Sequence, residues 1–109
     1  MAYDEVLAGR IQVVMEEMPG VVAKKMFGGV GFLLNGNMAC GVNKNNLIVR
    51  VGPDGYDKAL AEPHTSVFDM TGRPMTGWVV VSTEGCELDS DLKRWVNKGI
   101  AFAESLPPK

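Results

Sequence analysis

The side chains best suited to chemistry are two cysteines and the single histidine, Cys40, Cys86 and His64. A thiol nucleophile needs a base within hydrogen-bond reach and an electropositive, partly exposed setting. A structural zinc site needs four ligands at characteristic spacings. The three residues are scattered, and Cys40 lies in an apolar run, where a thiol behaves as a small hydrophobe. We therefore expect reduced thiols, no catalytic residue, no metal site and no cofactor.

Basic residues beside glycines offer a second kind of chemistry, the binding of phosphate. Lys24 and Lys25 precede a glycine-rich segment, GGVG, at residues 28–31. A P-loop requires a G-K-[ST] sequence that opens a helix, and neither feature follows. The glycines are better explained as a bend or a close backbone approach at a strand entry. The two lysines are then expected on an exposed sheet edge.

Arg50 is the basic residue whose expected setting most favours a binding site. The strand pattern described below places it among small residues, which leave a guanidinium accessible. If Lys25, His64 or Arg73 reaches the same face, the group would bind an anion or a peptide carboxylate. The alternative is that Arg50 pairs with a carboxylate such as Asp69 and that the face is solvated.

The length, composition and net charge of the chain indicate which general class of protein it belongs to. A chain of 109 residues, 46% of them hydrophobic, predicts one domain with a real core. A formal net charge of −2 and a pI of about 5.3 give no general attraction to nucleic acid or to an anionic membrane. No apolar run approaches the roughly 18 residues of a membrane helix, and the acidic first residues lack a signal-peptide layout. We expect a cytoplasmic protein that does not bind membranes.

Residues 24–51 predict a three-stranded antiparallel meander, and the other elements must pack on it. Asn35-Gly36 is a strong signal for a two-residue type I′ turn, and NKNN at residues 43–46 predicts a four-residue turn. The first turn pairs Leu34, Leu33, Phe32 and Gly31 with Asn37, Met38, Ala39 and Cys40. The second pairs Val42, Cys40 and Ala39 with Leu47, Val49 and Arg50.

Alternation of side chains divides this meander into two faces. One face would carry Leu33, Met38, Cys40, Val42, Leu47, Val49 and Val51. The other would carry Phe32, Leu34, Asn37, Ala39, Gly41, Ile48 and Arg50. Because the first set is uniformly apolar and the second is mixed, we expect the first on the core side and the second on an open surface.

The segments before and after the meander follow from periodicity and stop signals. Residues 3–18 carry a helical stripe with acidic residues in its first turn, and Pro19-Gly20 ends it. Residues 21–26 predict a first strand. A short helix is expected after Pro53, where proline suits a first helical turn, and it should end near Glu62.

The last third of the chain predicts strands followed by a long helix. A short strand is expected at residues 67–70, and an apolar strand at residues 78–82 should be central or covered on both faces. The clearest helical stripe spans residues 92–106, with Asp89 as a candidate N-cap and Gly99 as a point of close contact. The order α-β-β-β-β-α-β-β-α predicts an α+β fold. Its antiparallel sheet of about five strands would have helices mainly on one face.

Several short motifs carry a family resemblance. They are KKMFGG at residues 24–29, NGNMACGV at 35–42, VRVGP at 49–53, PH at 63–64, FDMTGRPM at 68–75 and LPPK at 106–109. In this order they make the chain similar to the TfoX N-terminal domain family over nearly its whole length. The resemblance implies one small α+β domain over residues 1–109, an antiparallel sheet flanked by helices.

The same resemblance bears on function. The family takes its name from bacterial regulators of natural competence for DNA uptake, and those longer proteins carry a second, C-terminal domain. We expect this protein to correspond to the N-terminal domain only. The resemblance brings no catalytic residues with it.

Three functional hypotheses follow. The first is a non-enzymatic binding or regulatory module that acts through a protein partner. The second is direct DNA binding through Lys24, Lys25, Lys44, Arg50 and Arg73, which the acidic pI disfavours. The third is a small-molecule or anion site on the open sheet face. A homodimer through that face or through an edge strand is a further alternative.

Overall fold

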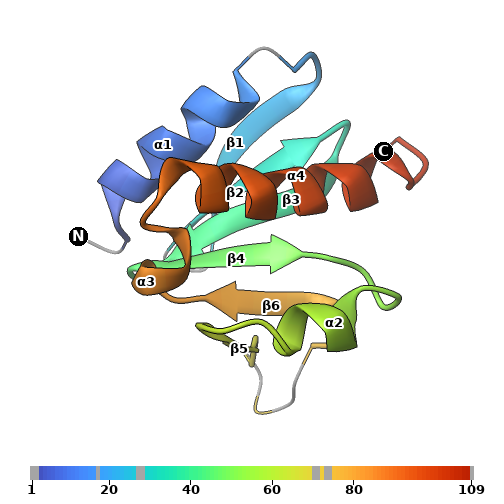
Figure 1. The fold of residues 1–109 in the computed structure, drawn as a ribbon. Helices are drawn as coiled ribbons and strands as arrows, with labels where there is room; N and C mark the ends of the chain where they lie inside the picture. Colours follow the sequence, from blue (N-terminus) through green and yellow to red (C-terminus); the bar gives the residue numbers. More distant parts are fainter. Residues whose placement is uncertain (1–2, 17, 27–28, 70–71, 73–74, 109) are drawn as a thin grey trace.

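The computed structural model describes residues 3–16, 18–26, 29–69, 72 and 75–108. Within these ranges the chain forms α1 (Glu5–Met15), β1 (Val21–Met26), β2 (Gly29–Leu34), β3 (Asn37–Asn43), β4 (Asn46–Arg50), α2 (Tyr56–Leu60), β5 (Thr65–Val67), β6 (Trp78–Val81), α3 (Thr83–Cys86) and α4 (Asp89–Glu104) (Figure 1).

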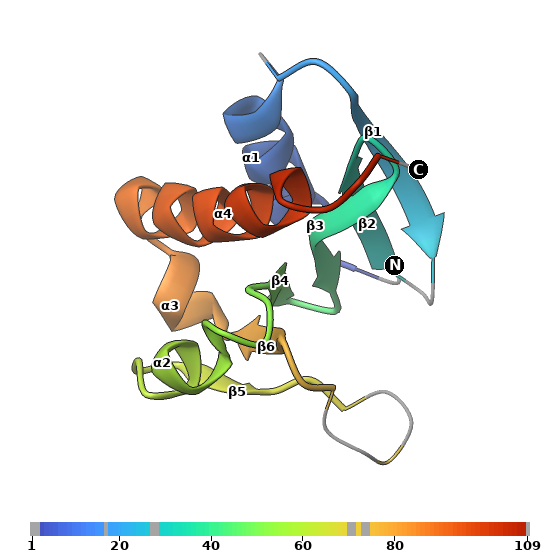
Figure 2. The same cartoon turned by 90° about the vertical axis from the view of Figure 1, so that its right-hand side faces the viewer.

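The strands form one sheet in the order β1-β2-β3-β4-β6-β5, and every neighbouring pair is antiparallel. The four labelled helices all lie on the same side of this sheet (Figure 2). One cluster of buried apolar side chains fills the space between the two layers. The predicted α+β fold with helices on one face is confirmed. The described residues give six strands, and the short helix α3 was not predicted.

The first hairpin begins as predicted, but its register then changes. Asn35 and Gly36 both have positive φ, 53° and 88°, as a type I′ turn requires. Two predicted pairs form, Leu34 with Asn37 and Leu33 with Met38. Phe32 then pairs with Cys40 instead of Ala39. Ala39 is therefore the extra residue of a β-bulge.

The second hairpin keeps most of its predicted register with a tighter turn. The expected pairs of Cys40 with Val49 and of Val42 with Leu47 form. Asn43 also pairs with Asn46, so the turn has two residues instead of four. The ladder ends at the pair of Cys40 with Val49, so the expected pairing of Ala39 with Arg50 was wrong.

The bulge makes part of the predicted face assignment wrong. Phe32, Leu34 and Asn37, expected on the open face, are buried on the helix-covered face. Leu33 and Met38, expected in the core, are half-buried on the opposite face. One extra residue shifts the alternation by one position, so all residues on one side of the bulge exchange faces. The core assignment is confirmed for Cys40, Val42, Leu47 and Val49.

The long helix α4 covers the centre of the sheet, where it contacts β2, β3 and β4. Its buried residues are Leu92, Trp95, Val96, Gly99, Ile100 and Ala103. A Cβ on Gly99 would overlap the Ala39 carbonyl oxygen and would come within 3.0 Å of the carbonyl carbon. The predicted close contact at Gly99 is therefore confirmed, and it falls at the bulge.

The helix starts differ from one another in how they are capped. Asp4 is the N-cap of α1, where its Oδ1 accepts hydrogen bonds from the backbone N–H groups of Val6 (3.0 Å) and Leu7 (3.1 Å). Asp89, predicted as an N-cap, is instead the first residue of α4, and Leu88 precedes it without a capping bond from its side chain. The carboxylate of Asp89 still lies in the first turn, where it suits the helix dipole.

Two strand predictions also need correction. The strand expected at residues 67–70 is β5, which ends at Val67, and Met70 lies outside the described residues. The apolar strand β6 lies next to the edge strand β5, and its alternate residues Val79 and Val81 are buried. Trp78 and Val80 are half-buried, so β6 is fully covered on one face only.

Candidate functional site

The candidate site lies on the sheet face opposite the helices (Figure 2). Pairing and alternation assign to this open face Val22, Lys24, Gly31, Leu33, Met38, Gly41, Ile48, Arg50, Trp78 and Val80. Val22 is 62% exposed, and Leu33, Met38 and Val80 are half-buried. Ile48, in the middle of β4, is buried at 3% exposure. None of the described helices lies on this side, so the face is a partly exposed apolar surface.

Arg50, the last residue of β4, lies at the end of the sheet, beside the open face, and its guanidinium stands between two aromatic rings from the two layers. Its guanidinium carbon Cζ lies 5.3 Å from the centroid of the Trp78 ring and 5.2 Å from that of Phe102. Trp78 is the cross-strand partner of Arg50 on β6, whereas Phe102 comes from α4. Both distances are within the range of cation–π attraction. We call these three residues the Arg50 site.

Two glycines bring the parts of the Arg50 site together. The carbonyl of Gly77 accepts hydrogen bonds from the N–H groups of Val51 (2.8 Å) and Gly52 (3.0 Å), which fixes the end of β4 against the start of β6. Gly52 has φ +84°, and a Cβ there would overlap the Phe102 ring. Glycine at this position therefore allows the backbone turn and the approach of the ring.

The guanidinium of Arg50 has ring neighbours but no acceptor within the described part of the chain. The ion pairs found there involve Arg10, Arg94 and Lys98. Asp69, the alternative partner, is exposed and does not pair with Arg50. All fully buried side-chain nitrogen and oxygen atoms in the described residues have partners. Within the described residues the nitrogens of Arg50 have none, and its side chain is only half-buried, so its N–H donors are open with respect to this part of the chain.

The other predicted site residues do not join Arg50. Lys25 is exposed on edge strand β1, which β2 and β3 separate from β4. His64 is also exposed, and its carbonyl accepts a hydrogen bond from the N–H of Ser82 (2.9 Å). It therefore lies at the end of β6 opposite Trp78. Arg73 lies outside the described residues.

The basic residues of the DNA hypothesis are likewise spread over the sheet. Lys24 is exposed on β1, about 14 Å from β4 at three strand spacings. Lys44 is in the turn before β4, at the opposite end of that strand from Arg50. Lys24, Lys44 and Arg50 therefore do not form one continuous basic patch.

Neither cysteine has the setting of a nucleophile. Both thiols are free. Cys40 is fully buried with its Sγ 3.9 Å from the Sδ of Met15, and burial raises the pKa of its thiol to about 12. Burial also raises the pKa of Cys86, although Arg10 partly opposes this change. Higher pKa values disfavour the reactive thiolate, and the exposed imidazole of His64 does not hydrogen-bond to either thiol.

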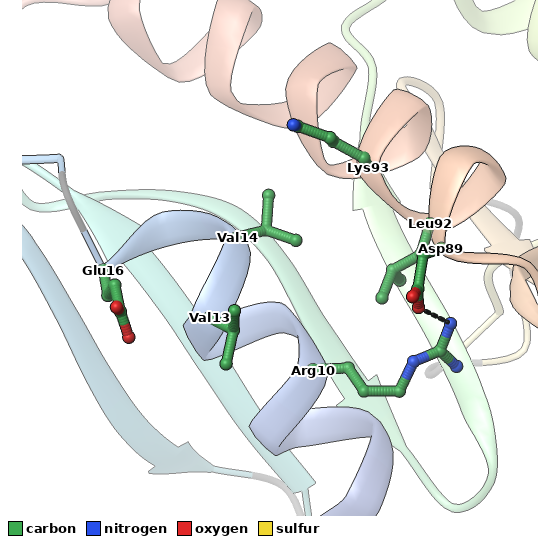
Figure 3. A pocket seen from close by; sticks show the side chains of 7 residues that line it. All are labelled: Arg10, Val13, Val14, Glu16, Asp89, Leu92 and Lys93. Carbon is green, nitrogen blue, oxygen red and sulfur yellow. Dashed lines mark hydrogen bonds and ion pairs between the residues drawn. The ribbon is translucent and has the colours of Figure 1, made fainter.

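A second surface feature, which was not predicted, is a hollow between α1 and α4 (Figure 3). It has a volume of about 570 Å³ and is lined by Arg10, Val13, Val14, Glu16, Asp89, Leu92 and Lys93. The Nη2 of Arg10 donates to the carbonyls of Cys86 (3.0 Å) and Glu87 (2.9 Å) and to the Oδ1 of Asp89 (3.1 Å). Because these three acceptors lie at the end of α3 and the start of α4, Arg10 ties α1 to that part of the chain.

The described residues contain no group of three or more His, Cys, Asp or Glu side chains able to hold a metal ion. None of their helices is both long and apolar enough to span a membrane.

The fold and the site together define a small α+β domain with one helical layer and one open, mostly apolar sheet face. The family model of the TfoX N-terminal domain matches residues 14–103, nearly the whole chain, and the chain belongs to this family. No curated protein and no solved structure matches it.

Proposed function

We propose that the protein is a non-enzymatic regulatory binding module, similar to the N-terminal domain of competence regulators, that acts in the bacterial cytoplasm through a protein partner. Membership of the TfoX N-terminal domain family supports the regulatory class. The open sheet face supports docking of a partner. The buried setting of both thiols supports a role without covalent catalysis.

The observation that carries this proposal is the composition of the open face. Its accessible large side chains are apolar, namely Val22, Leu33, Met38, Val80 and Trp78, and its charged residues within the described strands are Lys24 and Arg50. Protein interfaces have apolar and aromatic centres with few charges. Nucleic-acid interfaces are instead dense in basic residues, because they neutralise phosphates. The face therefore fits a protein partner better than DNA.

Site-specific photo-crosslinking in bacterial cells tests the proposal. A photoreactive benzoyl-phenylalanine replaces Val22 or Val80 on the open face, one at a time. The matched controls carry it at Gln12 on α1 or Asn97 on α4, which are exposed on the helical layer. We expect discrete adducts with one protein from both sheet positions and none from the controls. Adducts from the helical positions alone would place the partner on the other layer and refute the proposal.

DNA binding is tested separately by fluorescence anisotropy with a labelled duplex. A partner-binding module with a net charge of −2 should give no binding even at low ionic strength. Binding that weakens steeply as salt is added would instead show that phosphates are neutralised, and it would favour the DNA hypothesis.

A further inference from the structure

The Arg50 site has the parts of an anion receptor. Aromatic rings attract a guanidinium through its flat faces, whereas its N–H donors point outward in the plane of the group. At Arg50 two rings lie within 5.3 Å of Cζ, and none of the ion pairs within the described residues engages its donors. Packing thus orients the donors without using them, which lowers the entropy lost when a ligand binds.

A second arginine shows how this fold satisfies a guanidinium internally. Arg94 also lies over a ring, with its Cζ 4.9 Å from the centroid of Trp95. Its Nη1 pairs with the Oε1 of Glu62 at 2.8 Å, and its Nη2 lies 3.9 Å from the Oδ1 of Asp91. Arg94 and Arg50 therefore each lie over an aromatic ring, but each over a different one. Of the two, only Arg94 forms ion pairs with carboxylates of the described residues. At Arg50 a ligand can supply the carboxylate that the described residues do not provide.

We propose that Arg50 binds the carboxylate of a ligand whose apolar body lies against Trp78 and Phe102. Because the site adjoins the open face, the inference rests on the proposed function. A carboxylate carries one charge and accepts two parallel N–H bonds from a guanidinium. The site itself supplies one positive charge, which suits a monoanion better than a phosphate dianion. The aromatic walls select a carboxylate with an apolar or aromatic group attached.

The C-terminus of a polypeptide that ends in an apolar residue has this chemistry, and so does a small aromatic acid. The two sources differ in the backbone amide that precedes a terminal carboxylate. N-acetyl-phenylalanine carries this amide, and 3-phenylpropionate lacks it. Tighter binding of N-acetyl-phenylalanine would identify a C-terminus as the source. Equal or tighter binding of 3-phenylpropionate would identify a free acid. Either result supports the carboxylate site.

NMR titration tests the site directly, because the side-chain Nε–H signals of Arg50 and Arg94 and the indole signal of Trp78 report on individual groups. Because an exposed ion pair contributes little free energy, we expect weak binding, and the titration extends to high ligand concentration. With N-acetyl-phenylalanine we expect saturable shifts at Arg50 and Trp78 and little change at Arg94. The primary amide of the same compound should give no saturable shift at Arg50. Equal shifts with acid and amide, or none with either, would overturn the proposal.

Variants distinguish recognition by the paired N–H donors of a guanidinium from simple attraction to a positive charge. Arg50→Lys keeps the charge but loses the paired donors, and we expect it to weaken binding about tenfold, the effect of losing a charge-assisted hydrogen bond. Arg94→Ala, the matched control, should bind normally. Unchanged affinity in Arg50→Lys, or tighter binding of inorganic phosphate than of the carboxylates, would refute the assignment. These titrations contain no partner protein, so their failure would leave the crosslinking test of the proposed function unaffected.

Discussion

Replacing Gly99 with alanine tests the contact on which the two-layer packing depends. Gly99 lies in the middle of α4, where glycine costs about 1 kcal/mol of helix propensity relative to alanine. On propensity alone, Gly99→Ala should stabilise the protein. The structure predicts the opposite, because the added Cβ would overlap the backbone carbonyl of Ala39 in the sheet beneath.

The size of the effect follows from what has to move. Ala39 belongs to the bulge in β3, a strand paired on both sides, so its backbone cannot shift cheaply. Either α4 lifts from the sheet or the bulge distorts, and overpacking of this kind costs about 1–3 kcal/mol. Since the gain in propensity offsets about 1 kcal/mol of this cost, we expect a net loss near 1 kcal/mol. An unfolding entropy of about 2.1 cal/mol/K per residue converts this to a fall in Tm of about 4 °C.

Gly9→Ala is the matched control. Gly9 is also inside a helix, α1, but a Cβ there would meet no atom within 4 Å. This variant should therefore be more stable than the wild type by about 0.5–1 kcal/mol. Urea unfolding, followed by the fluorescence of the buried Trp95, measures both. If Gly99→Ala proves as stable as Gly9→Ala, then α4 does not approach the sheet as closely as described.

Three other predictions concern capping, helix docking and pH. Asp4→Ala removes the two N-cap bonds of α1 and should cost about 1 kcal/mol in urea unfolding; a change within error would mean that α1 is not capped by this side chain. Arg10→Ala should cost more than Asp89→Asn in the same assay. Arg10 donates to two carbonyls besides Asp89, whereas the Asp89 side chain is 97% exposed and its ion pair contributes little; the reverse order would contradict this. Because burial raises the pKa of Cys40 from 9.0 to about 12, the unfolded state releases a proton above pH 9 that the folded state keeps. Stability should therefore fall by about 1.4 kcal/mol more between pH 8 and pH 10 in the wild type than in Cys40→Ala, and parallel pH profiles of the two would refute the burial of the thiol.

Much of the fold could be predicted because strong local signals agree with it. Asn35-Gly36 specifies a type I′ turn through its own backbone preferences, and the turn sets the first pairs of the hairpin. The helical stripe of α4 and the glycine on it predict a buried helix with one point of close approach. Such signals need no knowledge of distant residues. Element boundaries were less reliable, as β5 shows, since tertiary pairing decides them.

The bulge at Ala39 shows why the face assignment partly failed. Nothing in the residues Met38-Ala39-Cys40 marks an irregularity, and a regular ladder explains an apolar set of alternate residues equally well. The bulge becomes visible only when β3 is paired with β2 and α4 is placed over it. A shift of one residue leaves composition unchanged but exchanges Phe32 and Leu33 between core and surface.

The Arg50 site depends on contacts between distant parts of the protein in the same way. Alternation predicted the strand face of Arg50, as its pairing with Trp78 shows, but it predicted small neighbours and not two aromatic rings. Phe102 belonged to a helical stripe and Trp78 to an apolar strand. Gly99 explains how Phe102 reaches the site: the close approach of α4 at Gly99 brings the next helical turn, with Phe102, down to the end of β4 beside Gly52. The contact that packs the helix on the sheet therefore also positions one wall of the Arg50 site. Since a helix transmits a displacement along its length as a rigid body, loosening this contact would separate Phe102 from the guanidinium without altering either residue.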